Sequence, residues 1–315
     1  MFAAFKKVRW EGVRAGIVLA DGILAVALVR RVAGGKPELL ESMSQPLLTA
    51  DPQASLRTGL DRAGVANART CAVLNPDEYQ VVQVESPEVL PSELRAAIRW
   101  RLRDAIGFSV DEAAIDIFAV PEPARQGAQK MLFAVAARDT AVQRLVGSVK
   151  PAARGFDAID VPELALRNIT AQLPQDQKGV AMIALHDQFV QLVITRQGTL
   201  YVTRRIDLRR ALPFGDRSQN DSTDIDAGAL ALELQRSLDY YESHYDKTPV
   251  GDLIIAPCND RAASLAEALR QESSLRVAVL DIREHFVVSR SGELLTDWNE
   301  VMAFGAALRS DAPGD

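Results

Sequence analysis

The chain has 315 residues, of which 48% are hydrophobic and 25% charged, a composition typical of a globular protein large enough for two domains and not of a disordered or fibrous one. Its formal net charge of −6 argues against a nucleic-acid partner, because the molecule repels a phosphate backbone. Cys71 and Cys258 are too few to staple a secreted protein of this size or to form a zinc site alone, so we expect a reducing, cytoplasmic compartment.

The N-terminal segment does not have the pattern of a signal peptide. Lys6 and Lys7 are followed at once by Arg9 and Glu11, where an unbroken apolar run is needed. The longest apolar stretch, residues 16–29, is interrupted by an aspartate and is shorter than the roughly 20 residues that cross a bilayer. We therefore expect the protein to meet a membrane only through its partners.

The chain opens with signals of antiparallel sheet. Residues 16–20 and 24–29 are short apolar strands joined by Asp21-Gly22, a strong hairpin signal. A second pair of short strands flanks the turn Asn75-Pro76-Asp77-Glu78, and we expect it to extend the same sheet.

The apolar period then becomes helical. Between residues 90 and 106 the apolar side chains recur on one face, and Gly107 suits the end of a helix. Strands at 115–120 and 131–136 and a helix at 140–150 follow.

The second half begins after a helix over residues 163–173. Pro174-Gln175-Asp176-Gln177 is interpreted as the seam between two domains, and a long hairpin beyond it turns at Gln197-Gly198. The polar stretch 215–226 predicts a mobile surface loop. The remaining predicted elements are a helix that begins at Asp226, a strand at 253–256, a helix at 264–271, a strand at 277–280 and a last helix at 298–308 that finishes the second domain.

The order of elements therefore repeats. Each half opens with a turn-linked antiparallel meander and continues into alternating strands and helices, which is the ground plan of actin-like nucleotide-binding proteins. We predict an α/β chain with a two-lobed actin-like (ribonuclease H-like) fold. The first lobe covers residues 1–173 and includes an inserted small α+β subdomain at about 86–150, and the second lobe covers residues 174–315.

Short strings of residues indicate a family. They are Glu93 to Trp100 (ELRAAIRW), 106–108 (IGF), 135–138 (VAAR), 158–161 (AIDV), 196–198 (RQG) with 203–204 (TR), 238–241 (LDYY) and 303–309 (AFGAALR). In these strings, and over nearly its whole length, the chain resembles the PilM proteins of type IV pilus assembly. It resembles still more their relative MshI from the mannose-sensitive haemagglutinin (MSHA) pilus system.

The resemblance implies a scaffold at the base of a pilus machine. Such a protein is cytoplasmic and peripheral at the inner membrane. It takes up the cytoplasmic N-terminal segment of a PilN-like or MshJ-like bitopic inner-membrane protein, in a groove beside the small subdomain, and this assembly couples to a separate pilus motor ATPase. An extended peptide bound in this way gains its specificity from side-chain pockets.

The resemblance also identifies the positions at which relatives bind ATP. Those relatives use a glycine-containing turn in each lobe for the phosphates and acidic residues for magnesium. The matching positions of this chain are Val18, Ala20 and Ala25 in the first lobe, and Ala184, His186, Pro257 and Cys258 in the second. Because apolar side chains replace carboxylate and lysine, and β-carbons replace glycine, we expect no bound ATP or magnesium and no enzymatic activity.

His186 and Asp187 are a pair with the residue types of a general base and its orienting carboxylate. A base needs a third partner and a substrate pocket that the sequence does not indicate, so a surface histidine is the better interpretation.

For the partner segment we predict Arg99, Trp100 and Arg103. On the predicted helix, Trp100 lies away from the apolar face, and tryptophan with arginine is typical of interface anchors. The alternative is that Trp100 packs against the sheet of the first lobe.

Hypotheses of other classes remain open. One is an active actin-like ATPase or kinase that uses unfamiliar contacts, and another is a filament former. A type II secretion platform component of the same fold is a weaker match, because its members continue into a membrane helix.

Overall fold

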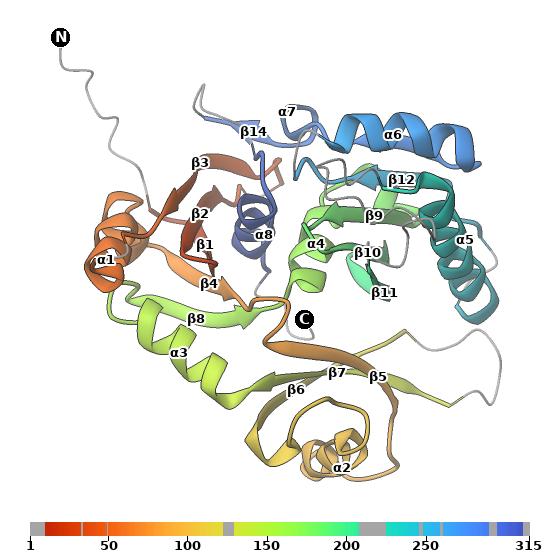
Figure 1. Cartoon of the computed structure of the whole chain (residues 1–315), viewed down its shortest axis with the longest axis horizontal. Coiled ribbons are helices and arrows are strands. Elements are labelled where there is room, and N and C mark those ends of the chain that lie inside the picture. The colour runs from red at the N-terminus through yellow and green to blue at the C-terminus, as the bar shows by residue number, and fades with distance from the viewer. Residues whose placement is uncertain are drawn as a thin grey trace, which may run out of the picture.

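The computed structural model describes residues 10–32, 34–48, 50–121, 129–207, 225–245, 248–258, 261–289 and 295–310. Three β-sheets organise this part of the chain (Figure 1). The loop predicted at residues 215–226 lies almost entirely outside the described residues. Over those ranges, no helix combines the length and the apolar character that crossing a bilayer requires.

The first sheet joins an antiparallel meander to parallel strands, in the order β14-β3-β2-β1-β4-β8. β1, β2 and β3 are antiparallel neighbours, whereas β4 and β8 run parallel to β1. Asp21 and Gly22 make the β1–β2 turn as predicted, with φ of 49° and 74° as a type I′ turn requires. The strands are β1 (Val13–Ala20), β2 (Ile23–Arg30), β3 (Glu38–Pro46), β4 (Arg69–Val73), β8 (Gly155–Asp160) and β14 (Val287–Val288).

The two faces of this sheet are covered by different helices. Because side chains alternate along a strand, Ile17 points into a core with α1 (Pro52–Arg62) and α3 (Asp139–Val149), while Val18 points to the opposite face. That face is covered by α8 (Trp298–Ala307). A β-carbon on Gly16 would lie 1.8 Å from the Ala303 carbonyl oxygen, so only glycine lets α8 lie this close to β1.

The small unit is a three-stranded antiparallel sheet of order β5-β7-β6, inserted between β4 and β8. One face is covered by α2 (Leu94–Leu102) and the other packs toward α3 and the first lobe. Its sheet begins at Tyr79, earlier than the expected start near residue 86, because the strand after the 75–78 turn pairs with β7 and not with the first sheet. The strands are β5 (Tyr79–Glu85), β6 (Ala113–Ala119) and β7 (Met131–Arg138).

The second sheet repeats the plan of the first, in the order β11-β10-β9-β12-β13. β9, β10 and β11 form the meander, and β12 and β13 run parallel to β9. Its strands are β9 (Val180–Leu185), β10 (Phe189–Arg196), β11 (Thr199–Asp207), β12 (Asp252–Ile255) and β13 (Arg276–Val279). The helices and 3₁₀ turns not yet given are α4 (Pro162–Thr170), α5 (Ala227–His244), α6 (Arg261–Glu272), α7 (Ile282–His285), η1 (Val65–Asn67), η2 (Val110–Glu112) and η3 (Pro174–Gln177).

Two helices lie side by side between the sheets (Figure 1). α4 packs on the second sheet and α8 on the first, and Gly305 meets the Ala165 backbone so closely that a β-carbon would lie 2.3 Å from its carbonyl oxygen. The Asn168 side chain also donates a hydrogen bond of 3.0 Å to the Gly305 carbonyl.

The C-terminal segment differs from the expected arrangement. We expected the helix at 298–308 to finish the second lobe, but α8 covers the first sheet and β14 pairs with β3. The reason is that α8 is buried along its whole length, and such a helix needs a layer on both sides. Residues 174–315 therefore do not all lie on the second sheet.

Candidate partner-binding site

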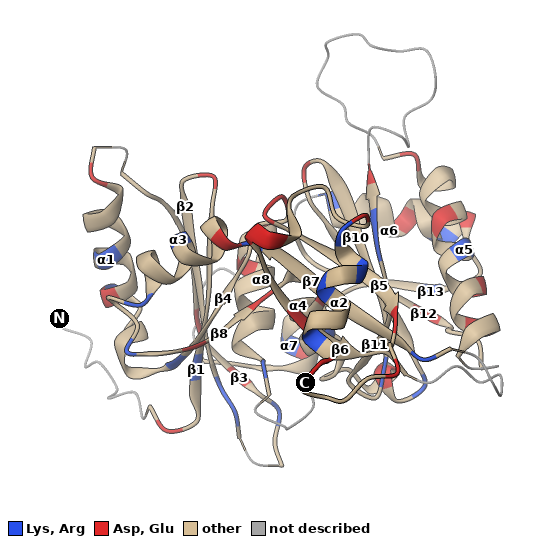
Figure 2. Cartoon of the chain, turned by 90° about the horizontal axis from the view of Figure 1, so that it is seen from below, with Lys and Arg blue, Asp and Glu red and all other residues tan. Residues whose placement is uncertain are grey.

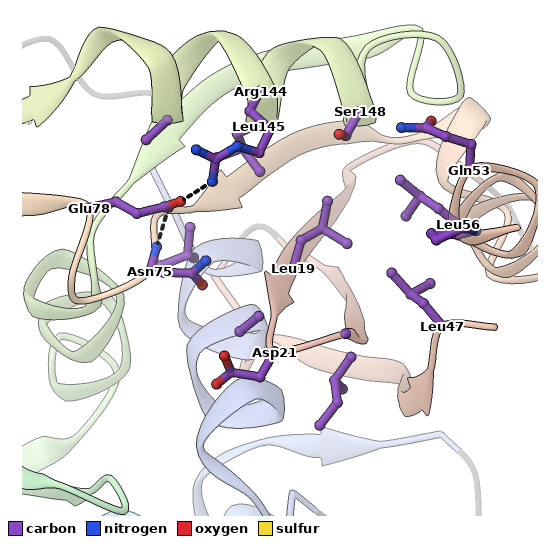
Figure 3. A pocket seen from close by; sticks show the side chains of 16 residues that line it. Leu19, Asp21, Leu47, Gln53, Leu56, Asn75, Glu78, Arg144, Leu145 and Ser148 are labelled. Atoms are coloured by element: carbon purple, nitrogen blue, oxygen red, sulfur yellow. Dashed lines mark hydrogen bonds and ion pairs between the residues drawn. The ribbon is translucent and has the colours of Figure 1, made fainter. Parts of the chain in front are cut away.

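A cavity of about 210 Å³ opens on the first lobe where the β1–β2 turn meets α1 and α3 (Figure 3). It lies beside the small unit, because the β4–β5 turn closes one side. The floor is formed by Leu19, Ile23, Leu47, Leu56, Val73 and Leu145. A hollow of this size with aliphatic walls suits an apolar side chain.

Polar groups surround this apolar floor. Glu78 forms an ion pair of 2.9 Å with Arg144 on α3, and its second carboxylate oxygen accepts the backbone N–H of Asn75 at 3.2 Å (Figure 3). Asp21, on the β1–β2 turn, also lines the opening. The rim therefore offers both charges and hydrogen-bonding groups to a ligand that enters.

One rim group lacks a partner within the described protein. Oδ1 of Asn75 is buried and accepts no hydrogen bond there. A buried acceptor left unsatisfied costs about 1–3 kcal/mol. Because this atom has almost no accessible surface, a ligand N–H would reach it only after the Asn75 side chain turns toward the cavity.

The segment that carries Asn75 and Glu78 also contacts α4 and β11. Asp77 lies 3.9 Å from Arg205 on β11, and the Tyr79 hydroxyl donates a hydrogen bond of 2.7 Å to Glu163 on α4. Burial raises the pKa of both the Tyr79 phenol and the Glu163 carboxyl. A single short segment thus forms one wall of the cavity and a contact to α4 and β11.

The first-lobe positions matched to ATP binding are filled with apolar side chains. Val18 and Ala25 face each other in the β1–β2 pairing and are buried in the core shared with α8. Ala20 ends β1 and lines the cavity described above. None of the three side chains carries a charge for a metal or a phosphate.

In the second lobe, His186 lies in an aromatic cluster. Its ring stacks on Phe189, with ring centroids 4.4 Å apart, and meets the edge of Trp298 at 5.1 Å. Burial lowers the pKa of His186, and its Nδ1 lies 3.3 Å from the backbone N–H of Gln188, which it accepts. Since Nδ1 is an acceptor, His186 does not have the arrangement of a base oriented by Asp187.

The other second-lobe positions are equally unsuited to nucleotide chemistry. Ala184 is buried within β9, and Pro257 and Cys258 follow β12. Burial raises the pKa of the Cys258 thiol to about 12, which keeps it protonated and unreactive. The described residues contain no group of three His, Cys, Asp or Glu side chains able to hold a metal. The residues at these positions do not fit magnesium ATP.

The three predicted partner-binding residues lie elsewhere. Arg99, Trp100 and Arg103 belong to α2 and its C-terminal end, across the small sheet from α3 and the cavity. Arg99 donates hydrogen bonds to the carbonyl oxygens of Val110 and Ala113, so it holds the loop after α2 in place. Trp100 is 68% exposed and does not pack against the first sheet.

Apart from Ala20, the cavity residues were not among those predicted. The sequence indicates the 75–78 turn and the Asp21-Gly22 turn, but it gives no sign that α1 and α3 close over them. In the structure, Glu78 and Arg144 are 66 positions apart in the sequence, and their ion pair joins the 75–78 turn to α3.

Comparisons with known proteins rest on structure. No family model matches the chain, and no curated protein matches it. The PilM–PilN type IV pilus biogenesis complex is similar with a TM-score of 0.64 and 18% identity, over 95% of this chain and 99% of that one. The cytoplasmic domain of EpsL, an inner membrane component of the type II secretion system of Vibrio cholerae, is similar with a TM-score of 0.50 and 10% identity, over 95% and 96%. A Bacteroides thetaiotaomicron protein with actin-like ATPase fold and unknown function aligns with a TM-score of 0.49 and 8% identity, over 88% and 93%.

The chain has the actin-like fold. Its two sheets of like order, each a meander extended by parallel strands, and the pair α4 and α8 between them agree with this assignment. The turn that walls the cavity also reaches the aromatic cluster around His186, because Asp77 contacts Arg205 and Arg205 lies over the Phe189 ring.

Proposed function

We propose that this actin-like chain is a cytoplasmic scaffold of a type IV pilus machine, of the MSHA kind, that binds the cytoplasmic N-terminal segment of a PilN-like or MshJ-like inner-membrane protein. The observation that carries the proposal is the cavity at the β1–β2 turn. It combines an aliphatic floor, a charged rim and a buried acceptor without a partner.

An extended segment fits this chemistry. One apolar side chain of the segment fills the floor between Leu56 and Leu145. Glu78 is already paired with Arg144, so Asp21 is the cavity-lining carboxylate that favours a basic side chain on the same segment. Docking of an extended peptide with one buried side chain is a common mode of recognition.

The scaffold role does not use ATP. The buried Val18 and Ala25 and the stacked His186 occupy the positions at which a triphosphate and its metal need carboxylate, lysine and bare backbone. The protein then reaches the inner membrane through its partner, and the pilus motor ATPase through the assembly. The similarity to the PilM–PilN complex supports this role more than it supports a type II secretion component.

Titration of the full chain with a fluorescent peptide tests the proposal. The peptide is the cytoplasmic N-terminal segment of a PilN-like membrane protein from the same cell, and anisotropy reports binding. We expect saturable binding that Ser148→Trp abolishes, because the indole fills the cavity from α3. Ser264→Trp on the exposed side of α6 is the matched control and leaves binding unchanged.

The same titration distinguishes the cavity from the predicted α2 contact. Loss of affinity in Trp100→Ala, with full affinity in Ser148→Trp, would assign the peptide to α2. If no such peptide bound to the wild-type chain, the proposal would be overturned.

Calorimetric titration with magnesium ATP tests the active ATPase alternative. We expect no heat of binding from a folded sample. Micromolar affinity would overturn the proposal of a scaffold that does not use ATP.

A further inference from the structure

The exposed side of α2 is a surface for which the proposed function has no use. Figure 2 views the molecule from the side on which α2 lies, with its arginines in blue. Trp100 is 68% exposed, and the Arg103 guanidinium lies over its ring, 4.3 Å from the ring centroid. Leu90, just before the helix, is 65% exposed. An exposed tryptophan beside arginine is the kind of residue that dominates protein interfaces.

The charges on α2 fall into two groups. Arg95 is paired with Asp116 and Arg101 with Glu85. Arg103 and Glu93, by contrast, form no ion pair within the described part of the chain. An acid without an ion pair thus stands at the N-terminal end of α2, and a base without one stands at its C-terminal end.

These groups share one face. At 100° per residue, Glu93, Ala96, Ala97, Arg103 and Asp104 lie within about 60° of Trp100 around the helix axis. Both Glu93 and Arg103 have helical backbone angles, so the helical geometry extends to them. The face therefore consists, along the helix, of an acid, two small residues, an indole, a base and a second acid.

This order is complementary to itself. Trp100 is two residues after position 98 and Ala96 is two before it, while Arg103 is five after and Glu93 five before. If two such helices pack antiparallel with their positions 98 level, each Trp100 covers the Ala96 of the other copy. The same register brings each Arg103 opposite the other Glu93.

We propose that α2 is the contact of a symmetric dimer of this chain, in which the α2 helices of two copies pack antiparallel in this register. A twofold contact requires such a self-complementary surface. The alanines allow the close approach of two helices, at interaxial distances of about 8–10 Å. One crossing of two short helices buries less than the roughly 1,200 Å² of stable complexes, so the dimer is weak and concentration-dependent.

Mixed acids and bases on the face exclude a membrane as the occupant. Seven acidic residues and four arginines lie between positions 85 and 116, so the small unit repels an anionic bilayer. A second copy satisfies both signs of charge at once.

Charge exchange between positions 93 and 103 tests the register. Sedimentation of the wild-type chain from micromolar to millimolar concentration is expected to show a monomer–dimer equilibrium. Arg103→Glu and Glu93→Arg each place like charges opposite one another and weaken the dimer about tenfold or more. The double variant restores it, and so does an equimolar mixture of the two single variants, because every facing pair is then of opposite charge.

A cysteine at position 97 tests the contact independently. The two native cysteines are buried, so an introduced thiol is the reactive one. We expect Ala97→Cys to form a disulfide-linked dimer under mild oxidation. Ala263→Cys, on an exposed face of α6, is the matched control and stays monomeric.

These measurements contain no partner peptide, so their outcome is separate from that of the scaffold proposal. A chain that sediments as a monomer at millimolar concentration and gives no 97–97 disulfide would overturn the dimer. A dimer that both single charge variants leave intact would overturn the register, and with it the assignment of α2 as the contact.

Discussion

The Tyr79 hydroxyl donates a hydrogen bond of 2.7 Å to Oε2 of Glu163, and both side chains are buried. Tyr79 begins β5 of the small unit, and Glu163 lies in the first turn of α4. The bond therefore joins the inserted unit to the helix that packs on the second sheet. Because β5 directly follows the turn that walls the cavity, this bond also fixes one side of the candidate site.

Glu163 gives the protein a pH-dependent component of stability. Burial raises its pKa in the folded state above 4.5, so the folded state binds the proton more tightly than the unfolded state. Its contribution to the free energy of unfolding is most favourable below pH 4.5 and declines as the pH rises through the folded pKa. The decline is about 1.4 kcal/mol for each unit by which the folded pKa exceeds the unfolded one.

Glu163→Gln removes this dependence, because the amide keeps an acceptor for Tyr79 without a charge. We expect the variant to gain stability relative to the wild type as the pH is raised from about 5 to about 8. Urea unfolding across this range measures the difference. A constant difference would show that Glu163 is not the titrating group, and Tyr79→Phe, expected to cost about 1–3 kcal/mol, checks the bond itself.

His186 titrates in the opposite sense. Burial against Phe189 and Trp298 lowers its pKa below 6.5, so the unfolded state binds the proton more tightly. Its contribution to stability is fully present above pH 6.5 and is lost as the pH falls through the folded pKa. We expect an imidazole NMR titration with a midpoint below 6.5 and a rise toward 6.5 in Trp298→Leu, which opens the ring to water. A midpoint at or above 6.5 in the wild type would contradict the buried, neutral ring.

The hairpin at Asp21-Gly22 shows what local sequence can predict. The turn type needs positive φ at two positions, and aspartate followed by glycine supplies it, so the prediction is confirmed by the angles. The helix expected over residues 90–106 is confirmed as α2 but is shorter, because its regular hydrogen bonding is limited to Leu94–Leu102 and turns flank it at both ends.

The helix α1 shows what local sequence does not predict. Only Leu56, Gly59 and Leu60 are buried in it, so its apolar pattern is short, although Asp51 and Pro52 are residue types that commonly begin a helix. Without α1 the cavity has no second wall, which is why the candidate site could not be predicted. The fold depends on repeated patterns within each lobe, whereas the cavity depends on contacts between segments far apart in the sequence.

The contact between Asp77 and Arg205 is expected to contribute little through charge. The two side chains are 87% and 40% exposed, and pairs of this kind are worth about 0.2–1 kcal/mol. Arg205 also lies over the Phe189 ring, 4.1 Å from its centroid. We therefore expect Arg205→Ala to cost more than Asp77→Ala in urea unfolding. A double-mutant cycle with a coupling well above 1 kcal/mol would show that the ion pair, and not the ring contact, dominates.

Gly305 is predicted to be irreplaceable, in contrast to another helical glycine of the same chain. A β-carbon at Gly305 would lie 2.3 Å from the Ala165 carbonyl oxygen, so Gly305→Ala forces α4 and α8 apart. α4 packs on the second sheet and α8 on the first, so neither helix can move without opening a core. We therefore expect the free energy of unfolding to fall by about 3 kcal/mol or more. Gly147 in α3 has nothing within 4 Å of its added β-carbon. Gly147→Ala should therefore stabilise the chain by about 0.5–1 kcal/mol through helix propensity alone. Equal effects of the two substitutions on urea unfolding would mean that the close packing of α4 on α8 does not hold the two sheets together.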